Sequence, residues 1–402
     1  MSAAAQPTLF AAPHRPMFLA GGVTLLTGFM LWALEMAARA ELLPALGWLL
    51  PAGWMHALIV LAGVFPFFMF GFLLTAMPRW QGMADLTAAH WLWPWRLLAG
   101  GWAVAFVGMW VPGVLALGLA SVLAGWAMVA RVLWTVAHQP RPERMHARIT
   151  CWGVIAGCVG VAFWLLAALT GEAVWARIAI NMGVWWFVLP VFFAVCHRMV
   201  PFFSSNIIPN YVMVRPRWVA AVVVGASLAH GLLAMFGAAH LAWIVDLPAA
   251  VATMWLSWRW RLLPSLKVPL LGMLHMGFAW LGVAWLLFAI QGLVATFGSF
   301  VLGMAPLHAL GIGFFGSILL GMVSRVTLGH SGRPLQADAL TWGLFLGLQL
   351  VVVLRILADL VPWALSAYVM LLAAIGWLGI FVAWGLRYLP IYWRPRVDGK
   401  TG

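Results

Sequence analysis

Apolar runs of about 20 residues follow one another along almost the whole sequence, separated by short segments that hold most of the charge. A helix of that length spans the hydrocarbon core of a bilayer. Charged residues are only 8% of the chain, whereas a soluble domain has about 25%. So little polar surface excludes a soluble enzyme, a nucleic-acid-binding module and a disordered chain. The sequence therefore indicates a polytopic integral membrane protein.

The runs predict an all-α helix bundle of twelve membrane spans, forming one transmembrane domain over residues 1–402 with no soluble domain. Continuous apolar runs, rather than alternation of apolar and polar residues, argue against a barrel. The approximate centres of the spans are Gly28, Phe67, Val107, Ala127, Val161, Phe187, Ser227, Ala249, Ala279, Phe314, Gln349 and Ile375.

The basic residues orient this topology. If the N-terminus and every even-numbered loop are cytoplasmic, all 22 Lys and Arg fall inside except Arg39, Arg177 and Arg355. This distribution is typical of the positive-inside rule and explains the net charge of +13 without a nucleic-acid surface. We expect an even number of spans with both termini in the cytoplasm.

The second, sixth and tenth spans each lead to a cytoplasmic arginine: Arg79, Arg198 and Arg325. These spans are four apart, which hints at three groups of four helices. Arginines at inner helix ends are common, so chance explains the pattern equally well.

Ionisable residues inside a membrane are costly and usually functional. Glu35 is the one convincing intramembrane carboxylate. The sequence therefore offers too few acidic groups within the membrane to form a proton relay. Histidines are more numerous, and imidazole is a frequent ligand of metals and of haem iron. For any single histidine, a hydrogen-bonded packing role is an equal alternative.

His56 and His308 begin the second and tenth spans, which both run inward from the outer surface. Their imidazoles are expected within roughly 5–8 Å of one height, as two axial haem ligands require. Gly63 and Gly311 follow them on the same helices and would leave room for a porphyrin, although close helix packing explains these glycines equally well.

Other histidines offer weaker candidates. His275, in the inner half of the ninth span, and His230, near the middle of the seventh, would serve a second centre or simply pack. His146 is assigned to a loop. A shared copper ion at Cys196 and His197 is disfavoured, because adjacent side chains on a helix point in different directions.

Several motifs resemble the NnrS family of membrane proteins. The most specific is Leu328-Gly-His-Ser-Gly-Arg-Pro334, which follows His308-Ala-Leu-Gly-Ile-Gly-Phe-Phe-Gly316 and Ser324-Arg325. Supporting segments are Gly71-Phe-Leu-Leu-Thr-Ala-Met-Pro-Arg-Trp80, Arg198-Met-Val-Pro-Phe-Phe203 and His275-Met-Gly-Phe-Ala-Trp280. Together they cover most of the chain.

The resemblance implies a haem- and copper-containing protein of the bacterial inner membrane, associated with the response to nitric oxide and nitrosative stress. It implies cofactor positions at His56, His275, His308 and His330, of which His56 and His308 would bind the metal. The family pattern near the second span is His-Ala-His-Glu, whereas this chain has His56-Ala57-Leu58-Ile59. The second His and the Glu are missing, which makes the chain a divergent member.

Three functions remain open from the sequence. The first is a haem protein that binds nitric oxide or a similar diatomic ligand, or that transfers electrons. Arg325 and Arg333 are candidate partners of the haem propionates, although positive-inside placement explains them better. The second is a secondary transporter of a small solute, which predicts charged or polar sites at the midplane. The third is a non-catalytic scaffold. No catalytic motif is visible, so whether the protein is an enzyme stays open.

Overall fold

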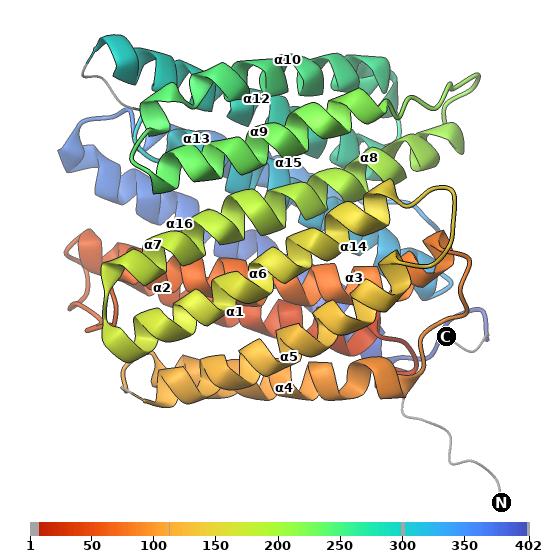
Figure 1. Ribbon diagram of the computed structural model, residues 1–402, viewed down its shortest axis with the longest axis horizontal. Helices are drawn as coiled ribbons and strands as arrows, with labels where there is room; N and C mark the ends of the chain where they lie inside the picture. Colours follow the sequence, from red (N-terminus) through yellow and green to blue (C-terminus); the bar gives the residue numbers. More distant parts are fainter. Residues whose placement is uncertain (1–7, 112, 299–301, 400–402) are drawn as a thin grey trace, which may run out of the picture.

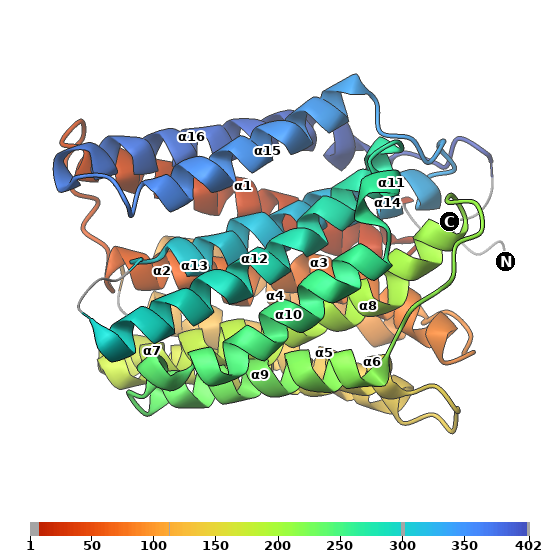
Figure 2. The same cartoon turned by 90° about the horizontal axis from the view of Figure 1, so that it is seen from above.

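Long helices formed by the apolar runs lie side by side along one axis in the computed structural model, which describes residues 8–111, 113–298 and 302–399 (Figures 1 and 2). Those residues contain helices and loops and no strand. Continuous helices are α1 (His14–Arg39), α4 (Ala88–Gly108), α5 (Val114–Ala137), α6 (Met145–Thr170), α9 (Arg217–Met235), α10 (Trp243–Arg259), α12 (Pro269–Phe297), α15 (Ala339–Leu357) and α16 (Trp363–Tyr388). Short elements are η1 (Thr8–Phe10), η4 (Ala239–Leu241), α11 (Leu262–Ser265) and η6 (Leu389–Trp393).

Three further helices each contain a π-helical segment, and we call them the central helices. They are α2–η2–α3 (Ala52–Leu58, Ile59–Val64, Phe65–Trp80), α7–η3–α8 (Ala173–Asn181, Met182–Val188, Leu189–Ser205) and α13–η5–α14 (Ala305–His308, Ala309–Gly316, Ser317–His330). In their most apolar windows 83%, 78% and 78% of the residues are buried, against at most 44% in the other candidate spans. The central helices therefore form the inside of the bundle, and the remaining helices surround them.

The two ends of the bundle are distinct. α1 begins and α16 ends at one end, where Arg15 donates hydrogen bonds to the carbonyls of Tyr392 and Arg394. We call this the terminal end, at the right of Figure 1, and the opposite one the distal end. Each central helix starts at the distal end, with α2, α7 and α13 there and α3, α8 and α14 toward the terminal end (Figure 2).

Ten helices of the described residues are long and apolar enough to cross a membrane. The two other predicted spans correspond to α4, with 21 residues, and α10, with 17 residues. These two pack against candidate spans, α4 on α5 and α10 on α12. The predicted centre of the third span, Val107, is displaced, because it lies next to the last residue of α4. α4 begins earlier than predicted, because the tryptophan-rich segment after Ala88 is part of the helix. Tryptophan side chains can lie on a membrane helix as well as at its interfacial end.

The helices repeat in groups of four, as the three arginine settings hinted. In each group the first helix (α1, α6 or α12) packs on the central helix that follows it. The last two helices of each group pack on one another: α4 on α5, α9 on α10 and α15 on α16. The fold thus places three central helices, each with one π-segment, in equivalent surroundings.

Two of the π-segments have a visible cause in the sequence. Pro66 and Pro190 follow η2 and η3 by two residues, and proline cannot donate to a preceding carbonyl. Side chains replace the missing donors: Trp102 Nε1 donates to the Ala62 carbonyl at 3.2 Å, and Ser227 Oγ donates to the Trp185 carbonyl. The widened turns are therefore stabilised by neighbouring helices rather than left with free carbonyls.

Candidate functional site

His56 and His308 lie at the distal ends of two central helices, directly before their π-segments. His56 is three residues before η2, and His308 is the residue before η5. Arg355 of α15 acts electrostatically on both histidines. Both histidines thus stand at the distal end, and their pairing stays a prediction.

The environment of His308 favours a ligand role. Its Nδ1 donates to the Met304 carbonyl at 2.9 Å, since a carbonyl oxygen only accepts. This bond fixes the tautomer and leaves the lone pair on Nε2. Gly311, three residues further along η5, has open space where a side chain would begin. A group could therefore occupy this position at Gly311 without displacing another atom.

His56 is held by aromatic rings of α1. Its ring stacks on Trp32 with centroids 4.2 Å apart and meets Phe29 edge-on at 5.7 Å. Phe29 in turn stacks on Trp377 of α16, at 4.9 Å. These contacts orient the His56 ring and make the surroundings of the pair apolar.

Two arginines stand beside this apolar site. Arg355 pairs with Asp359 at 2.8 Å, and Arg39 pairs with Glu35 at 2.9 Å. Arg39 also interacts electrostatically with His56. Arg39 and Arg355 are two of the three basic residues that depart from the positive-inside distribution. Their position beside the histidines gives a reason for this departure. Basic residues that depart from the positive-inside distribution are therefore a sequence signal that could have identified Arg39 and Arg355 as residues of the site.

At two places the structure favours the alternative that does not involve a haem. A Cβ at Gly63 would lie 2.7 Å from the Trp102 ring, so Gly63 provides room for an indole rather than a porphyrin. Arg325 lies 17 residues after His308, about 25 Å along the helix. Arg325 and Arg333 are therefore at the terminal end, too far away to pair with propionates of a haem at His308.

The remaining predicted residues also lie toward the terminal end. His275 is 2% exposed, and its Nε2 lies 2.8 Å from the hydroxyl of Ser204 on α8. His330 ends α14 and packs on His14, with ring centroids 4.5 Å apart. The structure does not bring these two histidines to His56 and His308.

Two buried pairs were missed in the sequence. His146 lies in the first turn of α6, not in a loop, and its Nε2 is 2.9 Å from Nδ1 of His197. Nδ1 of His230 lies 2.8 Å from the Asp246 carboxylate, and its ring stacks on Trp185 of η3 at 3.7 Å. No spacing in the sequence shows these pairs, because each joins two helices that meet only in the folded chain.

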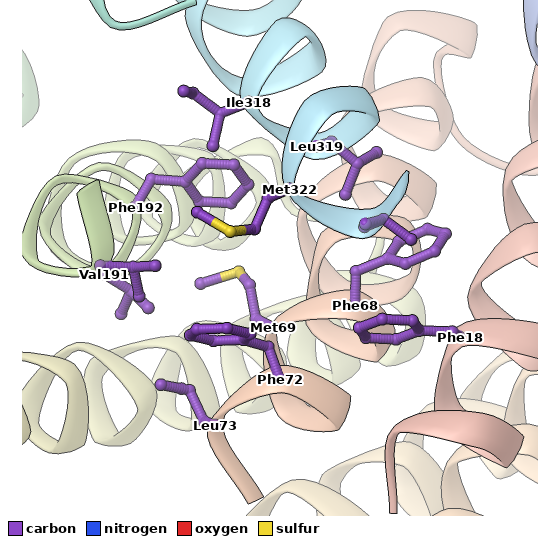
Figure 3. A pocket seen from close by; sticks show the side chains of 12 residues that line it. Phe18, Phe68, Met69, Phe72, Leu73, Val191, Phe192, Ile318, Leu319 and Met322 are labelled. Carbon is purple, nitrogen blue, oxygen red and sulfur yellow. The ribbon is translucent and has the colours of Figure 1, made fainter. Parts of the chain in front are cut away.

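A small cavity lies between the central helices. Its volume is about 50 Å³, and its lining comes from α3, α8 and α14 together with Phe18 of α1. Figure 3 shows the Met69 and Met322 side chains reaching into it from opposite sides, among Phe68, Phe72 and Phe192. The lining is entirely apolar, so this cavity offers no group that would bind a polar solute.

Comparison with known proteins places the chain in a family. A family model described as NnrS protein matches residues 8–396, nearly the whole chain. No curated protein sequence matches it. The match extends over all three four-helix groups and includes both ends of the bundle. The chain therefore belongs to the NnrS family.

Proposed function

We propose that this protein binds haem between His56 and His308 and acts in the response to nitric oxide or nitrosative stress. The family as a whole is associated with haem and copper and with this response. We also propose that the chain spans a bacterial inner membrane twelve times, with α4 and α10 included and with the terminal end in the cytoplasm.

The observation that supports the proposal is that His56 and His308 both stand at the distal ends of central helices, just before a π-segment, with Arg355 acting on each. The residues fit a haem. His308 has its Nδ1 engaged and its Nε2 available, Gly311 leaves space, and Arg39 and Arg355 offer positive charge for propionates.

A haem held there would supply one-electron chemistry or binding of a diatomic ligand. The protein's own contribution is orientation. Met304 fixes the His308 tautomer, and Trp32 and Phe29 fix the His56 ring. Because two imidazoles would hold the haem, the arrangement favours electron transfer over binding of nitric oxide.

His275 and His330 have no part in this centre under the proposal, since both lie near the other end. We do not propose the transporter alternative, because the central cavity has only apolar lining. The scaffold alternative gives no reason for two arginines and two histidines to converge at the distal end.

The absorption spectrum of the purified protein tests the proposal. We expect a Soret band in protein from haem-replete cells, and at least a tenfold loss of bound haem in His56→Ala and in His308→Ala. His275→Gln, a matched change of a buried histidine at the other end, should keep its haem. A colourless wild-type protein, or a full Soret band in both alanine variants, would refute the assignment.

A further inference from the structure

A groove on the outer surface of the bundle runs along α9 and α10, the last two helices of the second group. Its volume is about 690 Å³, and its lining includes Val222 of α9 and Leu247, Val251 and Ala252 of α10. These two helices lie at one edge of the molecule in Figure 1. The groove is separate from the proposed haem site, because His56 and His308 belong to other helices.

The length of the groove matches one acyl chain. Its lining includes Trp243 and Trp255, which are 12 residues apart on α10. The helix rises about 18 Å over that interval, and one leaflet of a bilayer holds about 15 Å of hydrocarbon. Ala252 and Val222 are small enough to leave a hollow between the tryptophans. A single lipid chain therefore has room to lie along the groove.

Two tryptophans mark the terminal end of the groove. Trp218 is the second residue of α9, and Trp255 lies four residues before the last residue of α10. Their ring centroids are 5.3 Å apart. Tryptophan is enriched where the hydrocarbon of a bilayer meets the headgroups. The pair therefore places the terminal end of the groove at the level of the lipid headgroups.

Two arginines stand next to this tryptophan pair. Arg217 is the first residue of α9 and directly precedes Trp218, and Arg259 is the last residue of α10. The Arg259 guanidinium lies 5.7 and 5.8 Å from the ring centroids of Trp255 and Trp258. Such cation–π contacts hold the charge beside the groove. A lipid with one chain in the groove would therefore bring its phosphate to these arginines.

The charge around the two arginines is not neutralised by the protein. Among the described residues, no carboxylate forms an ion pair with Arg217 or Arg259. From residue 201 to residue 298 the sequence has one acidic residue, Asp246, which bonds to His230 nearer the distal end. The same stretch has five basic residues: Arg215, Arg217, Arg259, Arg261 and Lys267. This surface complements an anionic headgroup, because a zwitterionic headgroup brings no net negative charge.

We propose that the groove binds one anionic glycerophospholipid from the leaflet around the terminal end. One acyl chain lies along Val222, Val251 and Ala252, and the phosphate lies between Arg217 and Arg259. Two arginines near a membrane surface correspond to at least a tenfold preference for an anionic headgroup over a neutral one.

Native mass spectrometry of the full-length protein tests the site. Protein delipidated in detergent is incubated with phosphatidylglycerol or with phosphatidylcholine that carries the same acyl chains. We expect one retained phosphatidylglycerol per chain and at least tenfold less phosphatidylcholine. The double variant Arg217→Gln/Arg259→Gln should lose this preference. Glycerol 3-phosphate, which has the phosphate without the chains, should not compete with the lipid.

Val251→Trp tests the position of the acyl chain. Val251 is 61% exposed, so an indole there fills the groove without entering the interior of the bundle. We expect at least tenfold less phosphatidylglycerol at an unchanged melting temperature. Leu232→Trp, at an exposed position of α9 outside the groove lining, is the matched control for this change. Arg131→Gln/Arg148→Gln, on α5 and α6, is the control for the arginine pair, and both controls should bind lipid as the wild type does.

Equal retention of the two lipids by the wild type would overturn the proposal. So would full phosphatidylglycerol binding in both the arginine variant and Val251→Trp. A dimer in gel filtration that Val251→Trp converts to a monomer, with lipid binding unchanged, would show that a second copy of the chain covers the groove. A wild-type protein that binds the lipid but shows no Soret band would count only against the function proposed above.

Discussion

At the scale of single residues, two glycines that look alike in the sequence have different roles. Gly63 and Gly311 both follow a candidate histidine on a central helix. Gly63 accommodates the Trp102 ring, whereas Gly311 has open space beside it. The sequence shows that both positions are small, but it does not show which side chain packs against each glycine, because that side chain belongs to another helix.

Gly311→Leu should lower the haem content several-fold and leave the melting temperature of the haem-free protein unchanged. The new side chain enters space where no atom is displaced, and it occupies the volume proposed for the porphyrin. The Soret absorbance per protein and a thermal melt measure the two effects. Normal haem content in this variant would show that Gly311 does not line the haem site.

Gly63→Ala is the complementary change. Its methyl group would stand 2.7 Å from the Trp102 ring, and overpacking of this kind costs about 1–3 kcal/mol. We expect a lower melting temperature with haem still bound in the folded fraction. An unchanged melting temperature would mean that Trp102 moves aside at little cost.

At the scale of elements, the π-segments decide how the histidines face. A π-turn holds one more residue than an α-turn, so it rotates the part of the helix before it relative to the part after it. His56 and His308 lie just before η2 and η5, and their directions therefore depend on these turns. Prolines after η2 and η3 are visible in the sequence, but η5 is followed by Ser317 and Ile318, and nothing there predicts its π-turn.

Deleting Ile312 from η5 should restore an α-helical turn. His308 would then rotate by about 100° relative to the terminal half of its helix. We expect loss of the Soret band with an unchanged gel-filtration profile, because the deletion leaves the other central helices intact. Retained haem would show that the π-turn does not position the ligand.

At the scale of the whole molecule, the basic residues mark one end of the bundle. Among the described residues, Arg39, Arg177 and Arg355 are the ones in the distal halves of their helices. The other described Lys and Arg lie toward the terminal end. This separation supports the proposed orientation, in which the terminal end faces the cytoplasm.

Cysteine labelling of intact spheroplasts tests that orientation. Leu43 and Leu335 are 44% and 46% exposed in loops at the distal and terminal ends. In a background with Cys158 changed to Ser, Leu43→Cys should react with an impermeant maleimide, and Leu335→Cys should react only after lysis. The reverse pattern would invert the topology.

The sequence by itself determined the class of the protein, its helical spans, their alternation and the end at which positive charge gathers. It did so because a helix in lipid satisfies its own backbone hydrogen bonds, and therefore each span is encoded locally by the length of its apolar run. The position of His56 and His308 at the same end of the bundle was also predictable, since depth along a helix follows from residue count.

Only the tertiary structure decided which side chains meet across helices. It joined His146 to His197 and His230 to Asp246, filled the room at Gly63, and moved Arg325 away from the proposed haem while placing Arg39 and Arg355 beside it. The physical reason is that such contacts depend on the rotation of each helix about its axis and on its neighbours. Side-chain packing and three π-turns set that rotation, and no apolar run encodes it.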